Sequence, residues 1–550
     1  MTAVAVERDL TVTAADGTRL LLDHHLPDLR GGGGRPGPGR PGAGLLVWIR
    51  TPYGRKGIAS IAGRFAKAGA HVVVEAMRGT DGSGGRYEPF SVTPADAASV
   101  LGWLRTRDWF PGAIVTWGLS AIGYASWALT EVDVPEWRLA ILQDAPSELR
   151  DGLVYPGGIF AGKVMLGFVG GVEWQARHWR ASLPRTMLAS VRAARRATKV
   201  LARPPLRTAD ERMVGHRVGY FQEWLDHEND DGYWKALDRR PGSAAMPGMV
   251  HLATGWYDVC LASTLADYRA LRQAGKAVRL LVGPWYHGRG AVDRALRDDV
   301  DGWLRAAAVA DAGPPAGEPV RVHVGGPGEW RDLPDWPPPG YQPSVWHLHP
   351  GGSLATDPAP ASDPDRYRYD PARPTPAVGG AVENFDGTAG AKDNRALEQR
   401  PDVLTFTSEP LDRDLEAIGP VSATIVFRSS LEHTDVLARL CDVHPDGRSV
   451  NLCDGARRLR PGQPGAAADG THAVEIDLTG VAHVFRTGHR IRLQVSSGAH
   501  PRLVRNSGTG EPVATAVEGH PADQEVFHDP GHPSTLTLRV QAPGRTSPDS

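Results

Sequence analysis

Cysteine is scarce in this chain of 550 residues, which contains only Cys260, Cys441 and Cys453. Three cysteines cannot build a disulfide framework, and at least one of them must stay unpaired. The C-x-x-C and H-E-x-x-H spacings of common zinc sites are also missing from the sequence. We therefore expect no metal site.

An excess of charge of either sign is missing as well. The chain has 61 basic and 63 acidic side chains, which gives a net charge of −2. Such a balance argues against electrostatic nucleic-acid binding. No uninterrupted apolar run approaches the roughly 18 residues of a membrane span. The first residues lack the basic region and apolar core of a secretory signal. We expect a soluble cytoplasmic protein that binds neither nucleic acid nor membrane.

What the chain does have is a serine between glycines at the end of a β-branched apolar run. Residues 113–117 predict a buried strand, Gly118-Leu119-Ser120 follows, and a small-residue helical segment begins at once. A sharp strand-to-helix turn of this kind exposes a nucleophilic serine above a sheet. By itself the motif is also typical of an ordinary turn, and the second glycine comes three residues after Ser120 instead of two. The context must therefore decide.

Two further residues at predicted strand ends supply that context. The segment 247–258 predicts a short strand that breaks at Gly255 and is followed by Asp258, and 279–287 predicts a strand stopped by Gly283 and Pro284 before His287. Taken singly, Asp258 fits a turn or cap former and His287 a surface loop residue. Serine, acid and histidine in this order match the α/β-hydrolase triad. The imidazole takes the serine proton and the carboxylate fixes the imidazole.

These segments resemble the cocaine esterase-like CocE/NonD hydrolase family, which is related to X-Pro dipeptidyl peptidases and α-amino acid ester hydrolases. The resemblance runs nearly end to end as an ordered series of blocks, at 50–54, 78–85, 118–123, 221–227, 255–258, 283–287, 400–406, 419–420, 487–493 and 505–508.

The resemblance implies a role for each candidate site residue. Ser120 is the expected nucleophile, Asp258 the orienting acid and His287 the base. The expected oxyanion hole combines the hydroxyl of Tyr53 with the backbone N–H of Ala121, where the family usually has tyrosine. This departure keeps the amide donor but removes a pocket wall. We further expect the substrate pocket to include Phe168, Trp174 and Cys260.

Strands that alternate with helical segments predict a mostly parallel sheet, and here they predict an α/β hydrolase fold. The catalytic domain is expected at 1–146 and 246–314. An inserted helical cap is expected at 147–245, with helices at 172–179 and 187–196 and a solvated basic face at 192–203. Short alternating segments such as 320–324, 423–427 and 491–495 predict a C-terminal all-β jelly-roll domain over 315–550.

The function expected from these features is a serine hydrolase that cleaves a small carboxylic ester or amide through an acyl-enzyme, without a cofactor. Val259, Cys260 and Leu261 carry no charge to hold a substrate ammonium, which favours a plain ester. Acyl transfer and X-Pro-type peptide cleavage on the same triad stay open. A non-catalytic scaffold or carbohydrate-binding protein with a galactose-binding-like β domain is the alternative from another class. Broad β faces are compatible with a homodimer.

Overall fold

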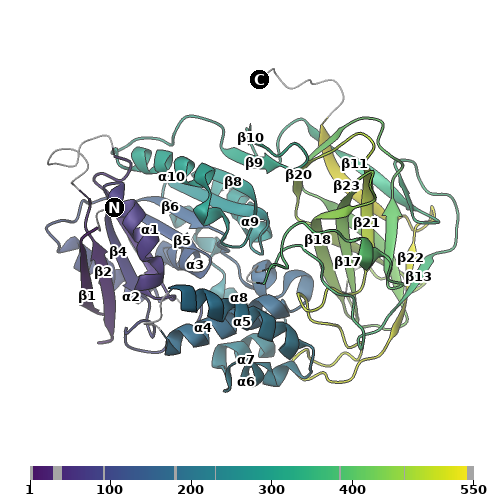
Figure 1. The fold of residues 1–550 in the computed structure, drawn as a ribbon, viewed down its shortest axis with the longest axis horizontal. Coiled ribbons are helices and arrows are strands. Elements are labelled where there is room, and N and C mark those ends of the chain that lie inside the picture. The colour runs from purple at the N-terminus through teal and green to yellow at the C-terminus, as the bar shows by residue number, and fades with distance from the viewer. Residues whose placement is uncertain are drawn as a thin grey trace.

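A ten-stranded sheet carries the N-terminal half of the chain in the computed structural model, which describes residues 4–28, 40–90, 93–178, 183–229, 231–382, 386–463 and 465–541 (Figure 1). The strand order is β1-β2-β4-β3-β5-β6-β7-β8-β9-β10, and the neighbours from β4 to β9 all pair in parallel. The strands are β1 (Val6–Thr13), β2 (Arg19–His25), β3 (Leu46–Thr51), β4 (His71–Ala76), β5 (Ile114–Leu119), β6 (Trp137–Gln143), β7 (Met249–Tyr257), β8 (Ala277–Tyr286), β9 (Val320–Val324) and β10 (Glu329–Leu333).

Helices cover both faces of this sheet, as a mostly parallel sheet requires. Successive side chains of β3 alternate between two cores, with Leu46 and Trp48 in one and Val47 and Ile49 in the other. The first core also receives side chains from α2 (Pro94–Arg105) and α9 (Leu261–Gln273), and the second from α1 (Arg55–Lys67) and α10 (Arg294–Ala307). The predicted α/β hydrolase architecture is confirmed.

A group of helices lies below the catalytic sheet and beside the C-terminal domain in the view of Figure 1, and it comes from the segment where the sequence predicts a cap. Its helices are α4 (Gly162–Arg177), α5 (Leu183–Leu201), α6 (Ala209–Val214), α7 (Gly219–Asp226) and α8 (Gly232–Leu237). Both expected helices are present, although α4 ends before Trp179, which is outside the described residues. On α5 the basic side chains Arg192, Arg195 and Arg196 are exposed while Ala193 and Ala197 are buried, as expected for a solvated face.

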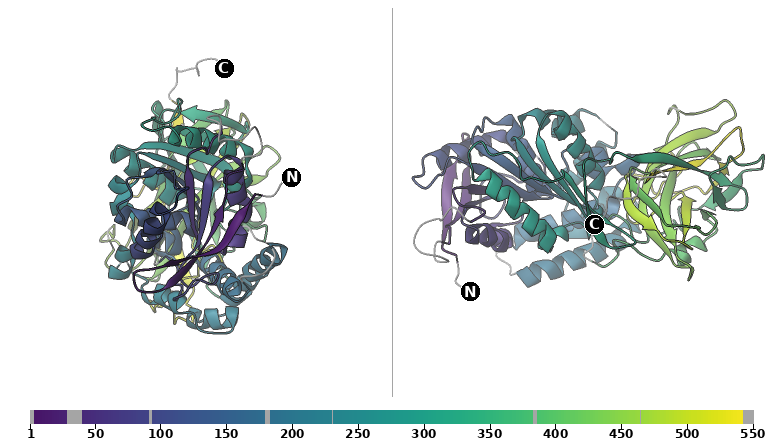
Figure 2. Two further views of the ribbon diagram at one scale, coloured as in Figure 1. Left: turned by 90° about the vertical axis from the view of Figure 1, so that its left-hand side faces the viewer. Right: turned by 90° about the horizontal axis from the view of Figure 1, so that it is seen from above.

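The remaining strands form a separate β-rich domain at the end of the molecule opposite the first strands (Figure 2). They are β11 (Tyr341–His349), β12 (Ser353–Ala355), β13 (Asp365–Tyr369), β14 (Val403–Thr407), β15 (Leu415–Gly419), β16 (Ser422–Ser429), β17 (Thr434–Val443), β18 (Ser449–Leu459), β19 (His472–Asp477), β20 (Val481–Phe485), β21 (Arg490–Ser496), β22 (Ala522–Phe527) and β23 (Thr535–Gln541), with one short helix, α11 (Arg395–Glu398). The expected strands at 423–427 and 491–495 are β16 and β21.

The placement of the expected strand 320–324 in the β domain is wrong. This segment is β9, which pairs in parallel with β8 and extends the catalytic sheet. Its alternating pattern suits either sheet, and only the pairing decides between them. The boundary between the two domains, expected at residue 315, stays a prediction.

Within the described ranges, none of the helices combines the length and the apolar character that crossing a membrane requires.

Candidate active site

Ser120 stands at the turn between β5 and α3 (Ala121–Trp127), at the carboxyl end of the sheet. Its backbone has φ 56° and ψ −126°, in a region that non-glycine residues seldom occupy and that costs about 1–3 kcal/mol. Two backbone hydrogen bonds hold the turn, from the Ser120 N–H to the Gln143 carbonyl at 2.9 Å and from the Tyr124 N–H to the Ser120 carbonyl at 3.0 Å. The strained turn therefore presents the serine hydroxyl in a defined direction.

Both glycines of the motif are required by the close crossing of strand and helix. A Cβ on Gly118 would lie 2.3 Å from the Gly123 nitrogen, and a Cβ on Gly123 would lie 2.4 Å from the Cβ of Ala145. Neither position can accept a side chain without moving backbone. The spacing of three residues after Ser120 thus places the second glycine where the helix passes closest to β5 and to the end of β6.

The strands that carry the other two candidates run past the glycines expected to break them. β7 continues through Gly255 to Tyr257, and β8 continues through Gly283 and Pro284 to Tyr286. The glycines make room for Trp285: a Cβ on Gly255 would lie 2.2 Å from the Trp285 carbonyl oxygen, and one on Gly283 would lie 2.4 Å from the Trp285 ring. They allow close packing within the strands instead of ending them.

The structure brings Ser120, Asp258 and His287 into a hydrogen-bonded chain. The Nε2 atom of His287 lies 3.0 Å from the Oγ atom of Ser120, and its Nδ1 atom lies 2.9 Å from the Oδ2 atom of Asp258. These residues follow β5, β7 and β8, whose carboxyl ends meet at one edge of the parallel sheet. With the proton on Nδ1 donated to Asp258, Nε2 is free to accept the Ser120 proton.

The surroundings of His287 favour its protonated form. Burial lowers the pKa of His287, but the charge of Asp258 and the hydrogen bond to it outweigh burial and hold that pKa well above the usual 6.5. Asp258 is itself 2 % exposed and accepts the Cys260 N–H at 2.6 Å. This arrangement can take a proton from a serine hydroxyl and stabilise the imidazolium that results.

The two expected oxyanion donors come from separate segments of the chain. Ala121 is the first residue of α3, where backbone N–H groups have no partner within the helix. Tyr53, in the loop between β3 and α1, is half-buried and packs against both the sheet core and the cap core. Tyr87 lies close enough that Tyr53 adds to burial in raising the pKa of the Tyr87 hydroxyl well above its ordinary value.

Of the expected pocket residues, Phe168 is part of an aromatic cluster connected to α3. Its ring stacks on Phe90 with centroids 5.7 Å apart and lies 6.1 Å from Trp224, and Phe90 meets the ring of Tyr124 edge-on at 5.4 Å. Tyr124 is on the helix that follows Ser120, so this cluster joins the cap to the nucleophile turn. Phe90 and Trp224 were missed by the sequence analysis, because aromatic residues far apart in the chain give no local signal.

Lining of a substrate pocket by Phe168 stays a prediction, and the other two expected residues lie elsewhere. Trp174 stacks on His178 near the end of α4, with ring centroids 4.7 Å apart. Cys260 is fully buried behind the triad, with its sulfur within 4.8 Å of a His287 nitrogen and an Asp258 oxygen, so it cannot form the wall of an open pocket. Burial raises the pKa of its thiol to about 12.

A cavity of about 390 Å³ lies between the cap and the β domain; of the triad, Asp258 lines it, whereas Ser120 and His287 do not. Val259, Leu153 and Val164 contribute apolar walls, and Glu148 and Asp151 are acidic residues on its border. The Glu148 carboxylate accepts the backbone N–H groups of residues 150–152. Asp151 pairs with Arg150. Glu148 and Asp151 are therefore already engaged, and Asp267, Asp454, Glu475 and Asp477 also line the cavity.

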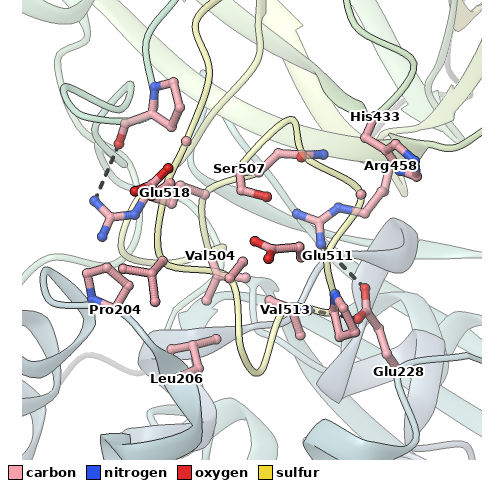
Figure 3. Close-up of a pocket in the computed structure, with 18 of the residues that line it drawn as sticks. Pro204, Leu206, Glu228, His433, Arg458, Val504, Ser507, Glu511, Val513 and Glu518 are labelled. Carbon is pink, nitrogen blue, oxygen red and sulfur yellow. Dashed lines mark hydrogen bonds and ion pairs between the residues drawn. The ribbon is translucent and has the colours of Figure 1, made fainter.

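A larger cavity of about 540 Å³ lies farther out, between the cap and the loop that carries Val504, Glu511 and Glu518 (Figure 3). The triad residues are not among those that line it. Its side chains include an ion pair of Arg458 with Glu228 at 3.7 Å. Basic and acidic side chains both line this cavity, namely Arg458, Arg460 and Arg505 with Asp226, Glu228, Glu511 and Glu518, so its lining does not select a ligand of one charge.

Comparison with known proteins agrees with this geometry. The profile of the X-Pro dipeptidyl-peptidase (S15 family) matches residues 16–289, and that of the X-Pro dipeptidyl-peptidase C-terminal non-catalytic domain matches residues 315–537. Cocaine esterase of Rhodococcus sp. (strain MB1 Bresler) is 30% identical over 594 residues, with 98% of each chain covered.

Solved structures show the same fold at lower identity. An α-amino acid ester hydrolase superposes with a TM-score of 0.80 and 20% identity, covering 98% of this chain and 97% of that one. A CocE/NonD family hydrolase from Staphylococcus aureus superposes with a TM-score of 0.67 and 16% identity, covering 97% and 93%.

Proposed function

Because the chain belongs to the CocE/NonD serine hydrolases of the X-Pro dipeptidyl-peptidase (S15) family, we propose that it cleaves carboxylic esters through an acyl-enzyme on Ser120. The observation that carries this proposal is the chain of hydrogen bonds from Ser120 through His287 to Asp258, at 3.0 and 2.9 Å. In the proposed first step, His287 takes the hydroxyl proton as the Ser120 Oγ atom attacks the substrate carbonyl.

The tetrahedral intermediate requires donors for its oxygen. In this proposal the Ala121 N–H and the Tyr53 hydroxyl supply them, and the protonated His287 then gives its proton to the leaving alkoxide. Water, activated by the same imidazole, attacks the acyl group and releases the acid. If an alcohol attacks the acyl-enzyme in place of water, the same residues would transfer the acyl group to that alcohol.

An ester is favoured over a peptide with a free amino terminus. An ammonium group needs an unengaged carboxylate near the reacting carbonyl. Among the acids of the cavity that Asp258 borders, Glu148 already binds three backbone N–H groups, Asp151 pairs with Arg150, and Asp454 pairs with Arg439 and Arg502. The lining of Val259, Leu153 and Val164 instead favours an apolar group.

Labelling with a fluorophosphonate tests the nucleophile directly. We expect the wild-type protein to be labelled at Ser120 and the S120A variant to stay unlabelled. Equal labelling of both proteins would show that another residue is the nucleophile. Labelling of neither, together with binding to a glycan array, would favour the scaffold alternative.

A panel of p-nitrophenyl esters, aryl esters and X-Pro anilides tests the substrate class. The proposal predicts kcat/KM values for esters that exceed those for X-Pro anilides. The reverse order would make the protein a peptidase. S120A serves as the background control for each substrate.

We also propose a cytoplasmic location, since Cys260, Cys441 and Cys453 are all unpaired, and free thiols persist in reducing compartments. Cell fractionation with an antibody tests this location. The homodimer expected from the sequence stays a prediction, and light scattering of the purified protein would test it.

A further inference from the structure

A second buried carboxyl lies against the triad at the end of β6. Asp144 is 4 % exposed, and its Oδ2 atom accepts the N–H of Gly288, the residue after His287, at 2.9 Å. Its own N–H donates to the carbonyl of Ala253 on β7 at 2.8 Å, and its backbone has a positive φ of 48°. Since β6 lies between β5 and β7, Asp144 is held between the strand of the nucleophile and the strand of the acid.

The side chains of Asp144 and Asp258 also lie within hydrogen-bonding reach of each other. Two carboxylates cannot form a hydrogen bond unless one of them is protonated. Burial, followed by the charge of Asp258, raises the pKa of Asp144 well above its ordinary value. The titratable groups that face Asp144 come from the ends of β7 and β8 and the turn before α9, and they are Asp258, His287 and Cys260. With its pKa raised in this way, Asp144 is the carboxyl that carries the shared proton.

We propose that Asp144 is a positioning residue for the triad, whose carboxyl bridges the Asp258 side chain and the Gly288 N–H. The donated O–H holds the Asp258 carboxylate in its orientation. The accepted N–H fixes the loop that carries His287. One side chain thus sets the relative position of the acid and the base, a role that rests on the proposed catalytic function of the triad.

This arrangement also tunes the imidazole. A hydrogen bond from Asp144 draws negative charge away from Asp258 and weakens its hold on the His287 imidazolium. Loss of the donor strengthens that hold, so that the acid limb of the kcat/KM pH profile moves to higher pH. An ionised Asp144 would have the opposite signature, because its replacement by a neutral side chain would remove a negative charge near His287.

The test compares D144A with D144N, using a p-nitrophenyl ester that the wild-type enzyme hydrolyses. D144A removes both hydrogen bonds, and we expect kcat to fall about 10- to 100-fold with KM changed less than about twofold. Its acid limb should move up by roughly 0.5–1 pH unit. D144N offers an N–H donor to Asp258 and a carbonyl acceptor to Gly288, and we expect it to recover kcat to within about threefold of wild type with the wild-type acid limb.

D96A is the matched control for the loss of a buried acid. Asp96 lies on α2, is 3 % exposed and pairs with Arg78 at 2.5 Å, and within the described part of the chain neither residue is hydrogen-bonded or ion-paired to the triad. We expect D96A to lower the unfolding midpoint without moving the acid limb. A purely structural role for Asp144 predicts the same result for D144A, and that result would overturn the proposal.

Two further outcomes would also overturn it. An acid limb that moves to lower pH in D144N would show that Asp144 is ionised in the wild-type enzyme. A D144N variant as impaired as D144A would show that the hydrogen bonds are not what the carboxyl supplies. Fluorophosphonate labelling separates this failure from failure of the proposed function, because wild-type protein must still be labelled at Ser120 if only the role of Asp144 is wrong.

Discussion

The close crossing at Gly123 gives a quantitative test of how the nucleophile turn is built. In G123A the new methyl group would start 2.4 Å from the Cβ of Ala145 and 3.0 Å from the Gly118 carbonyl oxygen. Carbon atoms in contact are about 3.5–4.0 Å apart, so the backbone of the turn or of the β6 end must shift by about 1 Å. Overpacking of this kind costs about 1–3 kcal/mol of stability.

The same shift should impair catalysis more than it impairs folding. A displacement of about 1 Å in an active site can cost about 100-fold in rate. We therefore expect G123A to lose about 100-fold in kcat toward a p-nitrophenyl ester while still unfolding cooperatively in urea. The rate of fluorophosphonate labelling should fall in parallel, because both reactions need Ser120 in the same orientation.

Two further variants serve as controls for G123A. G102A places a methyl group in the middle of α2, where no atom lies within 4 Å, and should stabilise the protein by about 0.5–1 kcal/mol. G123A/A145G removes the 2.4 Å contact and should recover part of the lost kcat relative to G123A, with A145G as its reference. Wild-type kcat and stability in G123A, or no recovery in the double variant, would show that this crossing does not position Ser120.

Three other variants or conditions test separate parts of the site. Y53F should lower kcat by about 10²–10³-fold with little change in folding, as measured by steady-state kinetics and circular dichroism, because it removes one oxyanion donor; an unchanged kcat would exclude Tyr53 from that role. The acid limb of kcat/KM should lie above pH 6.5, since the raised pKa of His287 keeps the base protonated until higher pH. A limb below that value would contradict the conclusion that Asp258 raises the pKa of His287. R55M should destabilise the protein by about 3–5 kcal/mol in urea unfolding, because the buried carboxylates of Asp23 and Asp81 lose their Arg55 partner at 2.6 and 2.9 Å; an unchanged midpoint would show that these charges are solvated.

Much of the catalytic framework could be predicted because it depends on local sequence. The run before Ser120 is apolar and β-branched, and the residues after it are small, so strand, turn and helix are encoded within one short segment. Asp258 and His287 each follow an apolar run directly. Parallel strands present their carboxyl ends at one edge, and this rule alone places the ends of β5, β7 and β8 together.

Other features could not be predicted because they depend on pairing between distant segments. The alternating pattern of residues 320–324 fits a strand in either domain, and only the hydrogen bonds to β8 assign it to the catalytic sheet. Trp174 and Phe168 lie on the same helix, yet only Phe168 joins the aromatic cluster with Phe90 and Trp224. Which aromatic residues meet depends on how α4 and α7 pack, and periodicity does not specify that.

Asp144 illustrates the difference between what the local sequence predicts and what the tertiary structure decides. An acid directly after a buried strand is a visible signal, and it stands one residue past β6, but nothing local says whether it faces solvent, the imidazole or another carboxyl. The sequence by itself determined the residue types of the triad, their order and the strands that carry them, because backbone propensity and hydrophobic pattern act over a few residues. Only the tertiary structure decided that Asp258 bonds to His287 while Asp144 accepts the Gly288 N–H, because these contacts depend on the strand order of the sheet.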